Sequence, residues 1–120
     1  MKRVPATVGA TLALLMASTS SFAATTYLTC EFADPSGKPQ VFNFALNQEA
    51  GTFGVYVPAS GSERMERGTF ADNKASLNEG AIAWEIDLAS GTIIRDRRMV
   101  GEKDQGSCSA ISAERSGFEQ

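Results

Sequence analysis

The chain has 120 residues, 14 of them acidic, 11 basic and none histidine, with two cysteines and one tryptophan. A chain of this length makes one domain. Without histidine it cannot build an ordinary Ser-His-Asp or Cys-His catalytic arrangement, nor a histidine-containing zinc site. We therefore expect a protein that is not an enzyme and that needs neither a metal nor another cofactor.

The first 23 residues have the pattern of a secretory signal peptide. Lys2 and Arg3 precede an uncharged apolar run from Val8 to Met16, and small residues lead up to Ala23. The apolar run is too short to span a bilayer. We expect cleavage after Ala23, which leaves one soluble β-domain over residues 24–120 in the periplasm or secreted from the cell.

Loss of the signal peptide makes the chain more acidic. Without Lys2 and Arg3 the basic count falls from 11 to 9 against 14 acidic residues, so the net charge becomes −5. Such a chain is not expected to bind nucleic acid or an anionic membrane surface by bulk electrostatics. A cationic partner suits it better.

Cys30 and Cys108 lie near the two ends of the expected domain. Disulfides persist in exported proteins, which favours a Cys30–Cys108 bond. In the chain-entropy model a loop of this length stabilises the fold by about 4.5 kcal/mol. Two separate thiols, reactive or buried, are the alternative.

Apolar and polar residues alternate in several runs, and this pattern predicts half-buried strands. The four clearest runs are Thr25 to Phe32, Val41 to Leu46, Thr52 to Val57 and Ala81 to Leu88. Their expected inward residues are Leu28, Cys30, Phe32, Phe42, Phe44, Leu46, Phe53, Val55, Val57, Ile82, Trp84, Ile86 and Leu88.

Shorter strands are expected at Gly68 to Ala71, Ala75 to Leu77, Thr92 to Asp96 and Gly106 to Ile111. Short strands with turns at near-regular spacing predict an all-β fold. We expect a small antiparallel barrel or sandwich of seven to eight short strands with one disulfide.

Three segments lack this alternation. Pro58 to Arg67 is expected to be a long loop, Arg97 to Gln105 an exposed loop, and residues 113–120 a flexible tail. Ala89 to Gly91 fits a three-residue hairpin loop with glycine in the left-handed conformation.

Charged residues near this hairpin are the first candidates for chemistry. Glu85 and Asp87 share one face of a strand, at a separation near that of glycosidase carboxylate pairs. Arg95 and Arg97 are well placed as cross-strand partners, so a salt-bridged outer face is the favoured interpretation.

Arg95, Arg97 and Arg98 form the basic cluster of an acidic chain. Grouped guanidinium groups can bind phosphate or carboxylate in fork geometry, which makes these residues a possible anion contact. Local neutralisation by the neighbouring acidic residues is the alternative.

An acidic exported domain with cysteines near both ends and a Ser60-Gly61 loop in mid-chain resembles the bacterial periplasmic inhibitors of C-type lysozyme. The resemblance implies an eight-stranded antiparallel barrel whose Ser-Gly-x-x-Tyr loop enters the lysozyme cleft. Ser60 and Gly61 match that motif, whereas Arg64 occupies the tyrosine position. The later Lys-Gly element has no match, since Glu79-Gly80 carries the opposite charge.

The chain also resembles small exported bacterial β-domains of unknown function. The likeness rests on Thr29-Cys30, on the stretch from Trp84 to Gly91, and on Gly106 to Cys108. It implies a fold and a compartment but no activity.

These observations give two main functional hypotheses, and an enzyme that works without histidine is the third alternative. The first is a non-catalytic binding protein, an inhibitor of a cell-wall hydrolase, with Ser60, Gly61 and Arg64 as the partner-binding residues. The second is a small-ligand carrier that uses the barrel mouth or the arginine cluster. An apolar cavity would favour the carrier, and a filled barrel with a protruding Ser60 loop would favour the protein binder.

Overall fold

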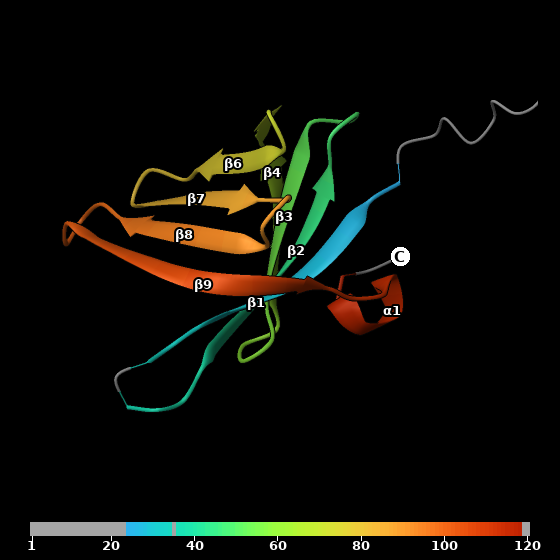
Figure 1. Cartoon of the computed structure of the whole chain (residues 1–120). Helices are drawn as coiled ribbons and strands as arrows, with labels where there is room; N and C mark the ends of the chain where they lie inside the picture. Colours follow the sequence, from blue (N-terminus) through green and yellow to red (C-terminus); the bar gives the residue numbers. More distant parts are fainter. Residues whose placement is uncertain (1–23, 35, 119–120) are drawn as a thin grey trace, which may run out of the picture.

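A computed structural model describes residues 24–34 and 36–118, and shows an all-β fold (Figure 1). The expected signal peptide, residues 1–23, lies outside the described residues. Nine antiparallel strands form a nearly closed barrel in the described part. The strands are β1 (Thr26–Phe32), β2 (Gln40–Asn47), β3 (Thr52–Val57), β4 (Ser62–Arg67), β5 (Thr69–Ala71), β6 (Lys74–Asn78), β7 (Ile82–Asp87), β8 (Thr92–Arg97) and β9 (Glu102–Ala110).

The strands follow the order β4-β3-β2-β1-β9-β8-β7-β6-β5. The two edge strands of the sheet, β4 and β5, are consecutive in sequence and are separated only by Gly68. Among the described residues no backbone ladder pairs β4 with β5, and we call the opening between them the seam. Figure 1 shows β1–β4 and β6–β9 facing each other across the core.

Gly68 is the corner at which the chain crosses from one edge of the sheet to the other. Its amide donates to the carbonyl of Gly51 at 2.9 Å. A Cβ here would lie 2.8 Å from Cβ of Phe53 and 3.0 Å from the Ser76 carbonyl oxygen. Only glycine allows the two halves to approach this closely.

The core confirms the alternation expected for the main strands, except at Leu88, which lies beyond the end of β7 and is exposed. Trp84 lies at its centre, with ring centroids 5.2 Å from Phe42, 5.3 Å from Phe44 and 6.4 Å from Phe32. The buried core residues are Leu28, Cys30, Phe32, Phe44, Leu46, Phe53, Val55, Ala75, Leu77, Trp84, Ile86 and Ile93. The tight aromatic packing leaves the middle of the barrel filled.

The disulfide between Cys30 and Cys108 is confirmed. The two residues are directly opposite each other on β1 and β9, with Cα atoms 4.0 Å apart. The bond therefore joins the first strand to the last across a sequence separation of 78 residues.

Four hairpins share one loop design, a four-residue turn that ends in glycine. The closing glycines, Gly51, Gly61, Gly91 and Gly101, have φ values of 73°, 76°, 76° and 68°. This left-handed conformation is readily adopted by glycine and closes the turn without strain. The turns are Gln48–Gly51, Pro58–Gly61, Leu88–Gly91 and Arg98–Gly101.

Both long loops expected from the sequence are wrong. The second half of Pro58 to Arg67 is strand β4, and only the turn Arg98–Gly101 separates β8 from β9. Charged residues, Arg64, Glu66 and Asp104, occupy inward positions of these strands. The apolar/polar alternation that predicts a strand is therefore missing there. Strand β4 is the ninth strand, one more than the seven to eight expected, whereas residues 102–105 only lengthen the expected last strand into β9.

The C-terminal segment, expected to be a flexible tail, is folded against the outside of the barrel up to residue 118. A short helix, α1 (Ala113–Ser116), precedes Phe118, whose side chain is 6% exposed. The Phe118 ring lies 5.8 Å from Tyr56 and 6.2 Å from Tyr27. Asn43 donates from Nδ2 to the Ser116 carbonyl oxygen at 2.8 Å, which fastens this segment to β2.

Candidate functional site

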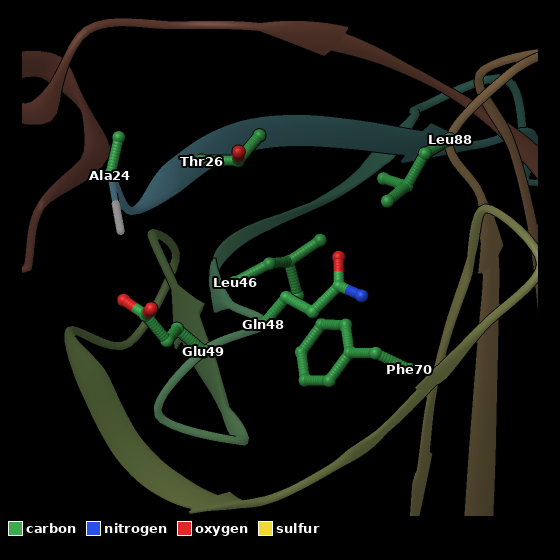
Figure 2. A pocket seen from close by; sticks show the side chains of 7 residues that line it. All are labelled: Ala24, Thr26, Leu46, Gln48, Glu49, Phe70 and Leu88. Atoms are coloured by element: carbon green, nitrogen blue, oxygen red, sulfur yellow. The ribbon is translucent and has the colours of Figure 1, made fainter. Parts of the chain in front are cut away.

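An open pocket lies at the end of the barrel where β2, β5 and β7 finish (Figure 2). Its volume is about 490 Å³, and we call it the mouth. Leu46, Phe70 and Leu88 supply its apolar surface, and Figure 2 shows Phe70 and Leu88 pointing into the shared space. The mouth is lined by Ala24, Thr26, Leu46, Gln48, Glu49, Phe70 and Leu88.

The mouth is held in place by the β5–β6 turn, the β7–β8 turn and the end of β2. The amide of Leu88 donates to the Asn73 carbonyl oxygen at 2.8 Å, which ties the β7–β8 turn to the β5–β6 turn. Leu46 is 3% exposed and forms the floor, whereas Leu88 is 40% exposed at the rim. Leu88 continues the inward alternation of β7 one residue beyond the end of the strand, so it has no facing core residue to cover it.

The mouth offers an apolar surface with a polar border. Gln48 and Glu49, both exposed, add an amide and a carboxylate to the same pocket. Such a site suits an apolar group that carries a hydrogen-bond donor or a positive charge at one end.

The opposite end of the barrel is closed by polar contacts around Glu79, in the β6–β7 turn. One oxygen of Glu79 accepts hydrogen bonds from Nη2 of Arg64 and from Nε1 of Trp84, each at 2.8 Å. Its second oxygen accepts from Nε of Arg64. The bond from Arg64 lowers the pKa of Glu79 to about 2.

Glu66 belongs to the same network, but its pKa is raised whereas that of Glu79 is lowered. Its hydrogen bond with Glu79 raises the pKa of Glu66, because two carboxylates beside each other resist ionising together. Arg64 lies 3.6 Å from Glu66 and partly offsets that repulsion. The bonds that Arg64 and Trp84 donate to Glu79 hold this end of the barrel closed.

Of the predicted partner-binding residues, Ser60 and Gly61 are exposed in the β3–β4 turn, and Arg64 is not beside them at the turn. Arg64 stands on β4 opposite Val55, on the inward side of the sheet. Its guanidinium is held by Glu79, so the expected three-residue surface is divided between a turn and the closed end.

Arg95 lies inside the barrel rather than on the outer face. It pairs in register with Trp84 and is 8% exposed, with its guanidinium carbon 4.5 Å from the Phe32 ring centroid. Nη2 donates to Asp104 at 2.7 Å, and Nη1 donates to Gln40 at 2.9 Å. The bond from Arg95 lowers the pKa of Asp104.

The physical reason for this correction is the length of the β7–β8 loop. The expected three-residue loop would have paired Glu85 with Arg95. The observed four-residue loop pairs Trp84 with Arg95 and Glu85 with Ile94. A shift of one residue turns every side chain of the returning strand to the other face of the sheet.

The three arginines do not converge on one anion site. Arg97 Nε also lies 3.1 Å from Asp104, and Arg97 Nη2 donates to Glu102 at 2.7 Å. Arg98 instead donates to Asn78 Oδ1 at 3.3 Å. The nearest carboxylates neutralise Arg95 and Arg97, which is the alternative weighed from the sequence.

Glu85 and Asp87 have separate surroundings. Glu85 is exposed on the outer face, whereas Asp87 accepts from the amides of Ala89 and Ser90 and so stabilises its own turn. Over residues 24–34 and 36–118 no group of three or more potential metal ligands is found.

Two features of the site were missed from the sequence. Glu79 closes one end of the barrel by accepting hydrogen bonds from Arg64. The two residues are 15 positions apart, and no pattern in the sequence of β4 indicates that they meet. The mouth could have been found from Leu88, because an apolar residue at an inward position beyond a strand end has no partner in the ladder.

Comparison with models of protein families, with curated proteins and with solved structures finds no match for this chain. The resemblance to lysozyme inhibitors therefore stays a prediction. In the described part of the chain, no helix has the length and apolar character needed to cross a bilayer.

Proposed function

We propose that this chain is an exported, non-catalytic binding domain that takes a small apolar ligand, or the apolar end of a larger one, in the barrel mouth. The observation that carries the proposal is the apolar hollow that Phe70 and Leu88 form over the buried Leu46, above a filled core. Ligand pockets are commonly apolar hollows with a few polar groups at their border.

The filled core limits how far a ligand can enter. Trp84, Phe44 and Ile86 occupy the middle of the barrel and are at most 2% exposed. A ligand can therefore rest on Leu46 and Phe70 but cannot pass between the sheets. Gln48 and Glu49 would orient the polar or cationic end of the ligand toward solvent.

Export to the periplasm or the cell exterior is part of this proposal. The Cys30–Cys108 disulfide supports it, because such bonds persist outside the reducing cytoplasm. The non-catalytic role is supported by the absence of histidine from the sequence and by the pairing of Glu79 and Asp104 with arginines.

Titration with N-phenyl-1-naphthylamine, an uncharged apolar fluorophore, tests the proposed site. We expect a saturable rise in fluorescence with one site per chain, and a weakening of at least about 10-fold in Leu88→Asp, which is about 1.4 kcal/mol. Leu88 is 40% exposed, so its substitution leaves the core intact. Met99→Ser, at the other end of the barrel, is the matched control and should bind normally.

A hydrolase inhibitor remains the second proposal, with a cationic or cell-wall-acting protein as partner. Its support is the turn Pro58–Gly61, which includes Ser60 and Gly61 and is exposed at all four positions. Assay of C-type lysozyme with increasing amounts of the protein tests it. Unchanged lysozyme activity at a large molar excess would remove this proposal and leave the mouth proposal standing.

A further inference from the structure

The β8–β9 turn differs from the three other turns of the same design. At the second and third turn positions those turns carry Glu49-Ala50, Ala59-Ser60 and Ala89-Ser90, whereas the β8–β9 turn carries Met99-Val100. All four end in glycine with a similar positive φ. The turn geometry therefore does not require large apolar residues at these positions.

Met99 and Val100, which we call the tip, stand in solvent. Met99 is 83% exposed and Val100 is 61% exposed. The other exposed methionine, Met65, has Sδ and Cε close to Gly54 on the outer face of the sheet. Two adjacent large apolar side chains without such cover form a small contiguous apolar patch, and contiguous patches are where interaction sites are sought.

Positive charge stands beside the tip. Arg98 is exposed within the turn, and Lys103 is exposed on the following strand. Arg97 is paired with Glu102 and Asp104. The tip therefore presents an apolar end with two cations next to it, and it matches an apolar hollow with acidic residues around it.

The same molecule has such a hollow at its other end. The mouth exposes Leu88 and part of Phe70 above the buried floor residue Leu46, with Glu49 in its lining. Asp72 and Asp87 lie in or beside the two turns that are joined at the mouth by the hydrogen bond between Leu88 and Asn73. Asp87 is already bonded to the amides of its own turn and stands opposite Lys74 in register. The acidity of this border therefore comes from Glu49 and Asp72, and it complements Arg98 and Lys103.

The tip and the mouth cannot meet within one molecule. Strand β8 starts at the turn that contains Leu88 and ends at the turn that contains Met99. Its six residues place the two sites roughly 20 Å apart along the strand direction. Figure 1 shows the β8–β9 turn projecting from one extreme of the barrel. Only a second copy can bring the two sites together.

We propose that the tip of one copy enters the mouth of a second copy, so that the chain associates head to tail. The contact is heterologous, since it joins two different surfaces, and each further copy can add to either end. Only a turn enters a shallow pocket, so the buried area is below ~1,200 Å² and the association is weak. This inference does not require the mouth to bind a small ligand.

Sedimentation velocity of the mature protein from about 10 µM to about 1 mM, the range where weak contacts populate, tests the proposal. We expect the mean sedimentation coefficient of the wild type to rise with concentration. Two variants, Met99→Ser/Val100→Ser at the tip and Leu88→Asp at the mouth, should each remain monomeric over the whole range.

Mixing the two variants gives the sharpest result. The tip variant keeps an intact mouth and the mouth variant keeps an intact tip. A head-to-tail contact therefore predicts that the mixture forms a dimer and no larger assembly. Ala59→Ser in the matched β3–β4 turn is the control and should associate like the wild type. Near-ultraviolet circular dichroism of each variant establishes that it is folded.

A wild type that stays monomeric at about 1 mM would overturn the proposal, since even weak contacts form at that concentration. Association that survives in the tip variant, or a mixture of variants that remains monomeric, would also overturn it. The tip variant keeps its mouth, so fluorophore binding by that variant tests the proposed function separately from self-association.

Discussion

Arg64 on β4 and Glu79 in the β6–β7 turn are joined by two hydrogen bonds across the seam. Among the described residues the edge strands β4 and β5 have no backbone ladder between them, so these side chains link the two halves at the end away from the mouth. The same carboxylate satisfies the buried Nε1 of Trp84. One glutamate thus connects the seam to the centre of the core.

Glu79→Gln is expected to lower the unfolding free energy at neutral pH and to make it depend less on pH in the acidic range. The pKa of Glu79 is about 2 in the fold, against 4.5 without the fold, so its contribution is present above about pH 4.5 and is lost as the pH falls toward 2. The contribution is at most about 3 kcal/mol. Urea unfolding should show a large difference between wild type and variant at pH 7 and a small one near pH 2.

Glu66→Gln is the control for this experiment and should act in the opposite direction. Neighbouring Glu79 raises the pKa of Glu66, so the ionised Glu66 carboxylate opposes folding at neutral pH. Its removal should leave the unfolding free energy at pH 7 unchanged or slightly higher. A loss of stability equal to that of Glu79→Gln would contradict the assigned roles.

Gly68→Ala is expected to lower the unfolding free energy by about 2–3 kcal/mol, in the range of overpacked sites. The added methyl would meet Cβ of Phe53 at 2.8 Å and the Ser76 carbonyl oxygen at 3.0 Å, and neither can move without shifting a strand. Urea denaturation measures the loss.

Gly80→Ala separates crowding from backbone strain. Gly80 has a φ of 88° and open space around its Cα, so alanine there costs only the left-handed conformation, about 1 kcal/mol. If Gly68→Ala cost no more than Gly80→Ala, the close approach at the corner would not be a determinant of stability.

The sequence allows the apolar half of the barrel to be predicted, since alternation identifies a strand when its inward residues are apolar. Phe42, Phe44 and Leu46 show this on β2. The pattern fails on β4 and on the start of β9, where Arg64 and Asp104 point inward and are satisfied by partners distant in sequence. Charge pairing inside a barrel leaves no periodic signal.

The site could be predicted only in part for a related reason. The face on which Arg95 lies depends on whether the β7–β8 loop has three residues, Ala89 to Gly91, or four, Leu88 to Gly91. Both loops end in the same glycine, so the sequence does not distinguish them. The mouth depends on how Phe70, Leu46 and Leu88 meet, and these residues come from three separate hairpins. Such meetings follow from closure of the barrel and not from local pattern.

Phe118→Ala is expected to destabilise the fold by about 3 kcal/mol, the lower end for loss of a buried phenylalanine. The ring packs on Tyr27 and Tyr56 at the outer face, where it is 6% exposed. Thermal unfolding measures the change. Glu114→Ala, in the exposed part of α1, is the control, and an equal effect of the two variants would show that Phe118 does not anchor the segment.

Reduction of the Cys30–Cys108 bond is expected to lower the unfolding free energy by about 4 kcal/mol, because it releases a long loop in the unfolded chain. Urea unfolding with and without dithiothreitol measures the difference. The unreduced mass should be two hydrogens lower than that of the reduced protein. Equal stability in both conditions would contradict this role.

Arg95 and Asp104 are expected to show a coupling energy of about 1–3 kcal/mol in a double-mutant cycle. Arg95→Met leaves Gln40 without its donor and Asp104 with Arg97 alone. Asp104→Asn leaves a cation that is 8% exposed beside two phenylalanine rings. Each single variant should therefore be strongly destabilised. The double variant should recover much of the loss, because replacing both partners of a buried pair removes the unpaired charge.

Arg97 and Glu102 provide the matched pair for this cycle. They lie on the same two strands, but their side chains are 40% and 61% exposed. Water screens such a pair, and its coupling should be below about 1 kcal/mol. Urea unfolding of the four proteins of each cycle gives both values, and an Arg95–Asp104 coupling no larger than that of the exposed pair would refute a structural role for the buried arginine.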